Sequence, residues 1–198
     1  MRIASFLGGA VGLMLAAGSA SAGALPGMKG MDHVGVTVPD MDQAVTFFVD
    51  VLGCQKAMSF GPFSDDKGTF MQDLVNVHPR SVIENITLIR CGNGSNIELF
   101  KYTAPDQKTE EPKNSDIGGH HIAFYTTDIA AASAYLKDSG IRQMMGPVPI
   151  QEGPAAGQSI QYFLSPWGMQ FEIITYPDGM AYEKDGGPVL WSPKNATN

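Results

Sequence analysis

Apolar and polar residues alternate in two short segments of the chain, at positions 33–38 and 121–125. Because successive residues of a β-strand point to opposite faces, this alternation predicts two strands, each with one buried face. The buried face of the first strand carries valines, and that of the second carries Ile122 and Phe124. The opposite faces carry His33, Gly35 and Thr37 in the first strand and His121, Ala123 and Tyr125 in the second.

The two strands belong to an internal repeat with an offset of 88 residues (121 − 33). Each strand is followed by an Asp, a helix-like segment (41–52 and 129–139) and a Gly, which are residues typical of helix N-caps and C-caps. Strand-like segments then follow in both halves, at 55–60, 83–90 and 96–102 and at 143–147, 160–164 and 170–176. We therefore predict an α+β fold of two fused βαβββ modules, covering residues 23–105 and 106–177, with a C-terminal tail at 178–198.

Residues 1–22 are typical of a secretory signal peptide. Arg2 precedes an uncharged apolar run, which ends in small residues and the sequence Ala20-Ser21-Ala22. A transmembrane anchor is the alternative, because the uncharged run is just long enough to span a bilayer. With cleavage after Ala22, we expect a periplasmic or secreted protein without a membrane segment.

Composition narrows the function classes. The formal charge of −7 and the pI of about 4.9 argue against a nucleic-acid partner. The two cysteines cannot build a thiolate zinc site. Cys54 begins one predicted strand and Cys91 ends another, so antiparallel pairing of these strands predicts a disulfide between them. Two buried free thiols are the alternative.

Four residues occupy equivalent positions in the two halves. Glu98 and Glu172 each interrupt an apolar strand, and each half also contributes the histidine of its first strand, His33 or His121. Two carboxylates on one concave face require a compensating cation. Imidazole and carboxylate ligands suit one divalent ion of Zn, Ni, Co, Mn or Fe.

The paired modules, with Asp-His-Val-Gly-Val-Thr-Val-Pro-Asp in one and Gly-His-His-Ile-Ala-Phe in the other, resemble the vicinal oxygen chelate superfamily. This group includes glyoxalase I, methylmalonyl-CoA epimerase, extradiol dioxygenases and bleomycin-resistance proteins. The resemblance implies a U-shaped mixed sheet around one metal ion held by His33, Glu98, His121 and Glu172. Ser165-Pro-Trp-Gly168 departs from the Asp-Pro-Asp-Gly that many relatives have before the last strand.

The four-ligand pattern implies a lyase, isomerase or epimerase that acts on a small carbonyl or hydroxy-carbonyl compound through an enolate-type intermediate. Glu172 is the first candidate for the catalytic base and Glu98 the second. An Fe(II) ring-cleaving dioxygenase and a non-catalytic binding protein for a small molecule such as an antibiotic are the alternatives. Two modules also allow a homodimer.

The segment 61–85 is long for a connection between two strands, and long loops are often functional. We predict that it covers the open side of the metal site, with Phe63, Phe70 and Met71 lining a substrate pocket together with Thr37 and Tyr125. The alternative is that the apolar residues of this segment pack it onto the body of the protein.

Overall fold

The computed structural model describes residues 25–195, so the predicted signal peptide lies outside the described residues. The chain divides into two units, Met1–Met31 and Asp32–Asn198. The described part of the first unit is a turn with a hydrogen bond from Met28 N to Leu25 O (3.1 Å). Over positions 25–195, no helix has the length and apolar character needed to cross a membrane.

The first module forms a four-stranded sheet in the order β1-β4-β3-β2, in which β1 and β4 are parallel and the other pairs are antiparallel. A π-helical turn (Phe47–Val51) extends α1, and α2 lies in the long connection between β2 and β3. The elements are β1 (His33–Thr37), α1 (Met41–Thr46), β2 (Gln55–Phe60), α2 (Phe70–Val75), β3 (Val82–Arg90) and β4 (Asn96–Thr103).

The second module repeats this arrangement with the order β5-β8-β7-β6. Its elements are β5 (Ile122–Tyr125), α3 (Ile129–Asp138), β6 (Val148–Pro149), β7 (Ser159–Leu164) and β8 (Gln170–Thr175). The α+β class and the two βαβββ modules are therefore confirmed. Segment 143–147 differs from its predicted strand, because only Gln143 forms a bridge, to Phe163, before Pro147 removes a backbone donor.

The helix boundaries follow the predicted caps. The Asp40 side chain accepts a hydrogen bond from Gln43 N (2.8 Å), and Asp128 accepts one from Ala131 N (3.0 Å). Both helical segments end near a glycine in the left-handed region, Gly53 (φ 71°) or Gly140 (φ 74°). The described part of the tail forms two 3₁₀ turns, and Lys194 Nζ donates to the carbonyl of Tyr176 (3.2 Å).

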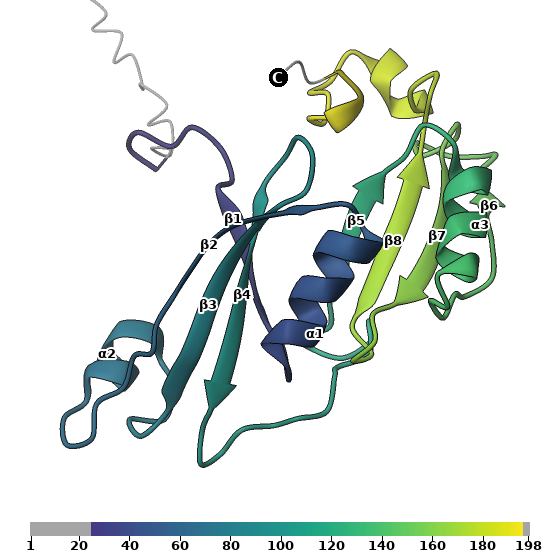
Figure 1. Cartoon of the computed structure of the whole chain (residues 1–198). Helices are drawn as coiled ribbons and strands as arrows, with labels where there is room; N and C mark the ends of the chain where they lie inside the picture. The colour runs from purple at the N-terminus through teal and green to yellow at the C-terminus, as the bar shows by residue number, and fades with distance from the viewer. Residues whose placement is uncertain (1–24, 196–198) are drawn as a thin grey trace, which may run out of the picture. The chain divides into compact units, whose positions relative to one another are not determined.

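One hydrophobic core joins the helix-covered faces of the two sheets. Phe47 and Phe48, at the end of α1, contact Phe171 of β8 with ring centroids 5.4 and 5.8 Å apart. Leu136 of α3 belongs to the same buried cluster. In Figure 1, α1 accordingly lies between the two sheets. The sheets are separate four-stranded sheets, and their other faces point away from this core.

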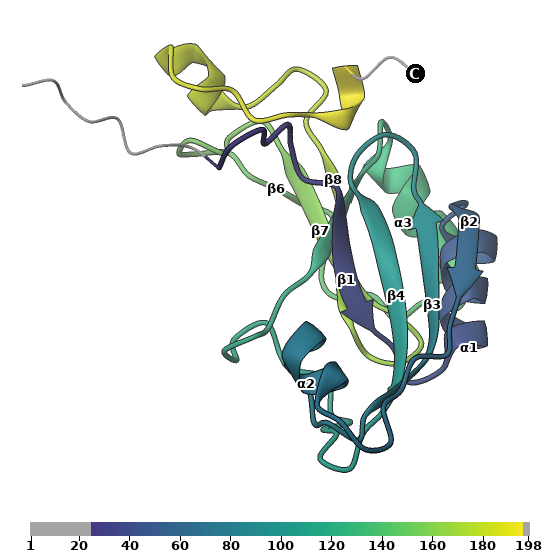
Figure 2. The same ribbon diagram turned by 90° about the vertical axis from the view of Figure 1, so that its left-hand side faces the viewer.

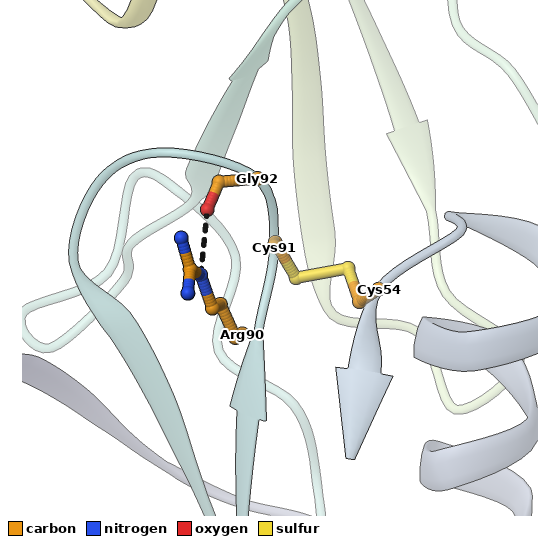
Figure 3. The surroundings of a disulfide bond; sticks show 4 residues. All are labelled: Cys54, Arg90, Cys91 and Gly92. Atoms are coloured by element: carbon orange, nitrogen blue, oxygen red, sulfur yellow. Dashed lines mark hydrogen bonds between the residues drawn. A yellow bond between two sulfur atoms is a disulfide. The ribbon is translucent and has the colours of Figure 1, made fainter. Parts of the chain in front are cut away.

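A disulfide joins Cys54, just before β2, to Cys91, just after β3 (Figure 3). The predicted bond is thus confirmed, and the antiparallel pairing of β2 with β3 explains it, since Gln55 lies opposite Arg90. Cys54 is 5% exposed and belongs to the shared core.

Loss of this disulfide is expected to destabilise the protein. The bond closes a loop with a sequence separation of 37 residues, for which the loss of chain entropy in the unfolded state predicts about 3–4 kcal/mol. Denaturant unfolding of Cys54→Ser/Cys91→Ser should give a correspondingly lower free energy of unfolding. Wild-type protein unfolded with and without reductant is the control. Equal stability of the oxidised wild type and the double variant would contradict this prediction.

Candidate metal centre

The four predicted ligands all lie on the sheet faces that point away from the shared core. In the first module, Glu98 of β4 lies beside Gly35 of β1 in the parallel register. In the second module, Glu172 of β8 lies beside Ala123 of β5 in the same way. The neighbours of each glutamate along its strand belong to the core, so strand alternation directs the glutamates outward. We call this outward surface of each sheet its ligand face.

The first histidine–glutamate pair joins β1 to β4. His33 Nε2 lies 3.1 Å from Glu98 Oε2, and His33 Nδ1 donates to Asp32 Oδ1 at 2.8 Å. The hydrogen bond from Asp32 raises the pKa of His33 above its usual value, and burial opposes this only in part. The imidazole is thus oriented by one carboxylate and presents Nε2 to another.

The second pair has the same form. His121 Nε2 lies 3.0 Å from Glu172 Oε2, and Asn114 Nδ2 lies 3.3 Å from His121 Nδ1. The Asn114 amide suits either ring tautomer, because its NH₂ donates to a bare Nδ1 and, when the amide is turned over, its oxygen accepts an Nδ1–H.

The two glutamates differ in their surroundings. The Glu172 side chain is 7% exposed and that of Glu98 is 17% exposed. Burial raises the pKa of the Glu172 carboxyl, while His121 and a hydrogen bond from Tyr162 offset part of this rise. Tyr162 lies opposite Glu172 in the antiparallel register of β7 and β8, whereas Leu88 lies opposite Glu98. Glu172 therefore has a hydroxyl donor across the strand where Glu98 has an apolar neighbour.

Tyr162 is a site residue that the sequence analysis missed. It touches both members of its pair, since its ring also lies edge-on to that of His121 with centroids 5.2 Å apart. The sequence contained enough information to place Tyr162 beside Glu172. If Leu164 and Gln170 flank a hairpin turn, antiparallel pairing requires that position 162 lies opposite position 172.

Tyr162→Phe is expected to lower any catalytic turnover that depends on Glu172 by about tenfold or more, because a hydrogen bond to a charged group contributes about 1.5–3 kcal/mol. The metal content should remain that of the wild type. Steady-state kinetics and elemental analysis check both values. Tyr182→Phe, which removes a hydroxyl in the tail, is the matched control. Unchanged kinetics in Tyr162→Phe would show that this hydroxyl does not assist Glu172.

The two pairs do not come together within one chain. Among residues 25–195, no group of three or more His, Cys, Asp or Glu side chains is close enough to hold a metal ion. From the sequence we predicted all four ligands on one concave face. The structure places them on two ligand faces instead, because the shared core holds the opposite faces of the sheets together.

The predicted pocket residues have different positions. Met71 of α2 is completely buried against Ile83 and Ile86, so it packs the long connection onto the ligand face of the first sheet. Phe63 and Phe70 remain 40% and 50% exposed. Thr37 is exposed at the end of β1, and Tyr125 is half-buried, with its ring edge-on to that of Tyr176. Of the three apolar residues predicted in this connection, only the two phenylalanines are therefore available to a ligand.

The chemistry of each pair suits a divalent metal ion. A neutral His33 that donates Nδ1–H to Asp32 directs a lone pair from Nε2 toward the Glu98 carboxylate, so a proton or a cation must lie between two electron-rich atoms. Metal-binding histidines typically have this outer partner on the second ring nitrogen. The two pairs together offer two imidazole nitrogens and two carboxylates, which fits the usual ligands of Zn, Ni, Co, Mn and Fe.

Comparison with known proteins identifies the family of the chain. The model of the glyoxalase/bleomycin resistance protein/dioxygenase superfamily matches residues 32–162. A 2-epi-5-epi-valiolone epimerase from an Actinomyces species is 40% identical over 173 residues, which cover 87% of this chain and 93% of that protein.

Solved structures support the fold. A glyoxalase family protein from Bacillus cereus superposes with a TM-score of 0.57 at 18% identity, covering 77% of this chain and 98% of that one. A protein from the mobile metagenome of V. Pseudocholerae gives a TM-score of 0.50 at 23% identity, covering 78% of this chain and 99% of that one. With the family model matching most of the chain, this protein belongs to the glyoxalase/bleomycin resistance protein/dioxygenase superfamily, which is the vicinal oxygen chelate group.

Proposed function

We propose that this protein is a divalent-metal-dependent epimerase of a small hydroxy-ketone. The observation that carries the proposal is the 40% identity, over nearly the whole length of both chains, to a 2-epi-5-epi-valiolone epimerase. The relative favours this reaction over ring cleavage of aromatics and over simple sequestration of a small molecule. The two histidine–glutamate pairs support it further, since they supply both metal ligands and candidate bases.

Epimerisation beside a carbonyl group requires a proton to leave one face of a carbon and another to arrive on the opposite face. The C–H bond breaks toward a base, and its electron pair moves to the carbonyl oxygen to form an enediolate. Protonation of the opposite face then restores the ketone with inverted configuration. A divalent ion bound at a histidine–glutamate pair, His121 with Glu172 or His33 with Glu98, would supply positive charge beside the substrate oxygens.

Glu172 is the residue best suited to remove the proton. Burial raises the pKa of the Glu172 carboxyl toward neutral pH. A general base is most effective when its pKa lies near the pH at which the enzyme works. His121 and Tyr162 fix its orientation from two sides. Glu98, in the other histidine–glutamate pair, is the second candidate for the base.

The direct test is the conversion of 2-epi-5-epi-valiolone, with the Actinomyces relative as the positive control. The protein is loaded in turn with Zn, Ni, Co, Mn and Fe(II). With at least one of these ions it should convert this ketone to a mixture of two epimers, which NMR distinguishes. The proposal is contradicted if no metal supports conversion under conditions in which the relative is active.

We further propose that the protein works outside the cytoplasm after removal of residues 1–22. The disulfide supports this location, because such bonds persist in oxidising compartments. Protein recovered from the periplasm or the medium should begin at Gly23 by N-terminal sequencing. Full-length protein with free thiols in the cytosol would contradict export.

A further inference from the structure

A polar pocket of about 600 Å³ lies on the face of the first sheet that α1 covers. Strand register places it on this face, since Thr87 lies opposite the core residue Leu99 and Ser59 lies opposite Thr87. Figures 1 and 2 show α1 and α2 on opposite sides of the sheet, and α2 packs on the ligand face. The pocket is therefore separate from the histidine–glutamate pair of this module. We call it the α1 pocket, and its polar lining includes Asp42, Lys56, Ser59, Asn85, Thr87 and Lys101.

A directed chain of hydrogen bonds crosses the sheet side of the pocket. Thr87 is 1% exposed, and its hydroxyl donates to Asn85 Oδ1 at 2.9 Å. A hydroxyl has one hydrogen, so Thr87 Oγ1 accepts the bond that joins it to Ser59 Oγ at 2.7 Å. Because Asn85 Oδ1 is the acceptor in this chain, the amide nitrogen keeps its two N–H donors for another partner. The pocket thus contains two donors that can bond an oxygen of a ligand.

The two lysines of the pocket lie toward opposite ends. Lys56 is opposite Ile89 and Lys101 is opposite Asn85, so four residues of β3, about 13 Å, separate the two levels. Lys101 Nζ pairs with Glu84 Oε2 at 3.2 Å. Among residues 25–195, no carboxylate forms an ion pair with Lys56. The Lys56 end therefore carries an uncompensated positive charge, whereas the Lys101 end is neutralised.

The start of α1 contributes hydrogen-bond acceptors to the pocket. Asp40 uses one carboxylate oxygen to cap the helix, and Asp42 follows in the first turn. Both carboxylates lie toward the Lys101 end, since β1 ends with Thr37 beside Phe100 in the parallel register. This end therefore combines carboxylate acceptors with an ammonium donor. Hydroxyl groups suit such a surface, because each of them can donate and accept at once.

The second module fills the equivalent position with longer side chains. Gln161 occupies the position that corresponds to Thr87 in the repeat. Gln161 Nε2 donates to Gln143 Oε1 (2.8 Å), and Gln143 Nε2 donates to the carbonyl of Ser133 in α3 (2.7 Å). Two glutamines thus connect this sheet directly to its helix. In the first module the shorter Ser59 and Thr87 bond to each other, and a pocket lies between them and α1.

We propose that the α1 pocket binds a small polyhydroxylated molecule that carries one anionic group, such as a sugar acid or a sugar phosphate. The anionic group pairs with Lys56, and the hydroxyl groups bond to Asp42 and Lys101 at the other end. The Asn85 amide donates to an oxygen between the two ends. The volume lies within the range of roughly 300–1,000 Å³ that is usual for small-molecule sites. This site goes beyond the proposed epimerase and uses none of its residues.

Calorimetric titration of the purified protein with gluconate, glucose 6-phosphate and glucose tests this site. At least one of the two anionic probes should bind with one equivalent per chain and a Kd below about 1 mM. Glucose has no anionic group for Lys56, so it should bind at least about tenfold more weakly. Amide NMR signals of the pocket residues should shift on binding. A Glu98→Gln/Glu172→Gln protein should bind the probes as the wild type does.

Two variants with matched controls test the assigned roles. Asn85→Asp keeps the oxygen that accepts from Thr87 but removes both N–H donors, so it should weaken the anionic probes by about tenfold or more. Lys56→Met should weaken the anionic probes by a similar factor and leave glucose unchanged. Gln72→Glu and Lys137→Met make the same changes at exposed positions of α2 and α3 and should bind normally. Circular dichroism verifies the fold of each variant.

Three results would overturn the site. The first is a wild-type protein that binds both anionic probes more weakly than about 10 mM. The second is a loss of binding in Glu98→Gln/Glu172→Gln, or NMR shifts centred on the histidine–glutamate pairs, which would assign the probes to the candidate metal centre. The third is wild-type affinity in a folded Asn85→Asp and a folded Lys56→Met. None of these results bears on the epimerase, which is tested separately by conversion of its own ketone.

Discussion

Glu172→Gln is expected to lower the rate of epimerisation by about a hundredfold to ten-thousandfold. Positioned general bases contribute about 10²–10⁴ to enzymatic rates, and glutamine has nearly the same shape but cannot accept the proton. The shared core does not include this side chain, so the fold should be unchanged. Turnover is measured by NMR on 2-epi-5-epi-valiolone, with circular dichroism and metal content measured on the same samples.

Two control variants distinguish the loss of Glu172 as a base from the loss of a carboxylate charge elsewhere. Glu152→Gln changes an exposed carboxylate in the loop before β7 and should retain full turnover. Glu98→Gln should lower turnover less than Glu172→Gln does, because it leaves the Glu172 base in place. A Glu172→Gln protein with bound metal and wild-type turnover would show that another group removes the proton.

Loss of either histidine ligand is the second large effect that we expect. His121→Ala should weaken metal binding by more than about a hundredfold, because loss of an outer partner alone already costs about 10–100-fold. Epimerisation should fall in parallel, and chelation of the wild-type metal should have the same effect, which added metal reverses. Elemental analysis after dialysis, followed by kinetics, measures both quantities.

The neighbouring histidine gives a matched control for this prediction. His120 precedes His121 in the sequence, but its Nδ1 bonds to the carbonyl of Gly118 (3.0 Å) instead of joining a glutamate. His120→Ala should therefore keep both metal and turnover. Equal loss in the two variants would assign the effect to the local backbone and would contradict a ligand role for His121.

Much of the fold could be predicted from the sequence, because the repeat marks most of the strands and both capped helices. The histidine strands, the Asp caps and the Cys54–Cys91 pairing follow from alternation, capping and strand order. The presence of one histidine and one glutamate on the same face of each sheet also follows from strand alternation and the repeat, whereas the prediction placed all four residues together. These features are local or repeated, so a single chain contains enough information to place them.

The arrangement of the modules could not be predicted in the same way. Alternation shows which residues share a face but does not show which faces of two sheets pack together. That depends on the fit of Phe47 and Phe48 against Trp167 and Phe171, which joins residues more than a hundred positions apart. For the same reason Met71 was predicted in the pocket, although it is buried in the contact between α2 and the first sheet.

Proton exchange with solvent is the most direct test of an epimerase that works by proton abstraction. Metal-loaded protein is incubated with 2-epi-5-epi-valiolone in D₂O, and the substrate and product are followed by NMR and mass spectrometry. We expect one deuterium at the inverted carbon of the product. Exchange of the substrate proton with solvent should require both Glu172 and the metal. Conversion without deuterium at that carbon, or no conversion while the Actinomyces relative reacts, would contradict an epimerase that works by proton abstraction.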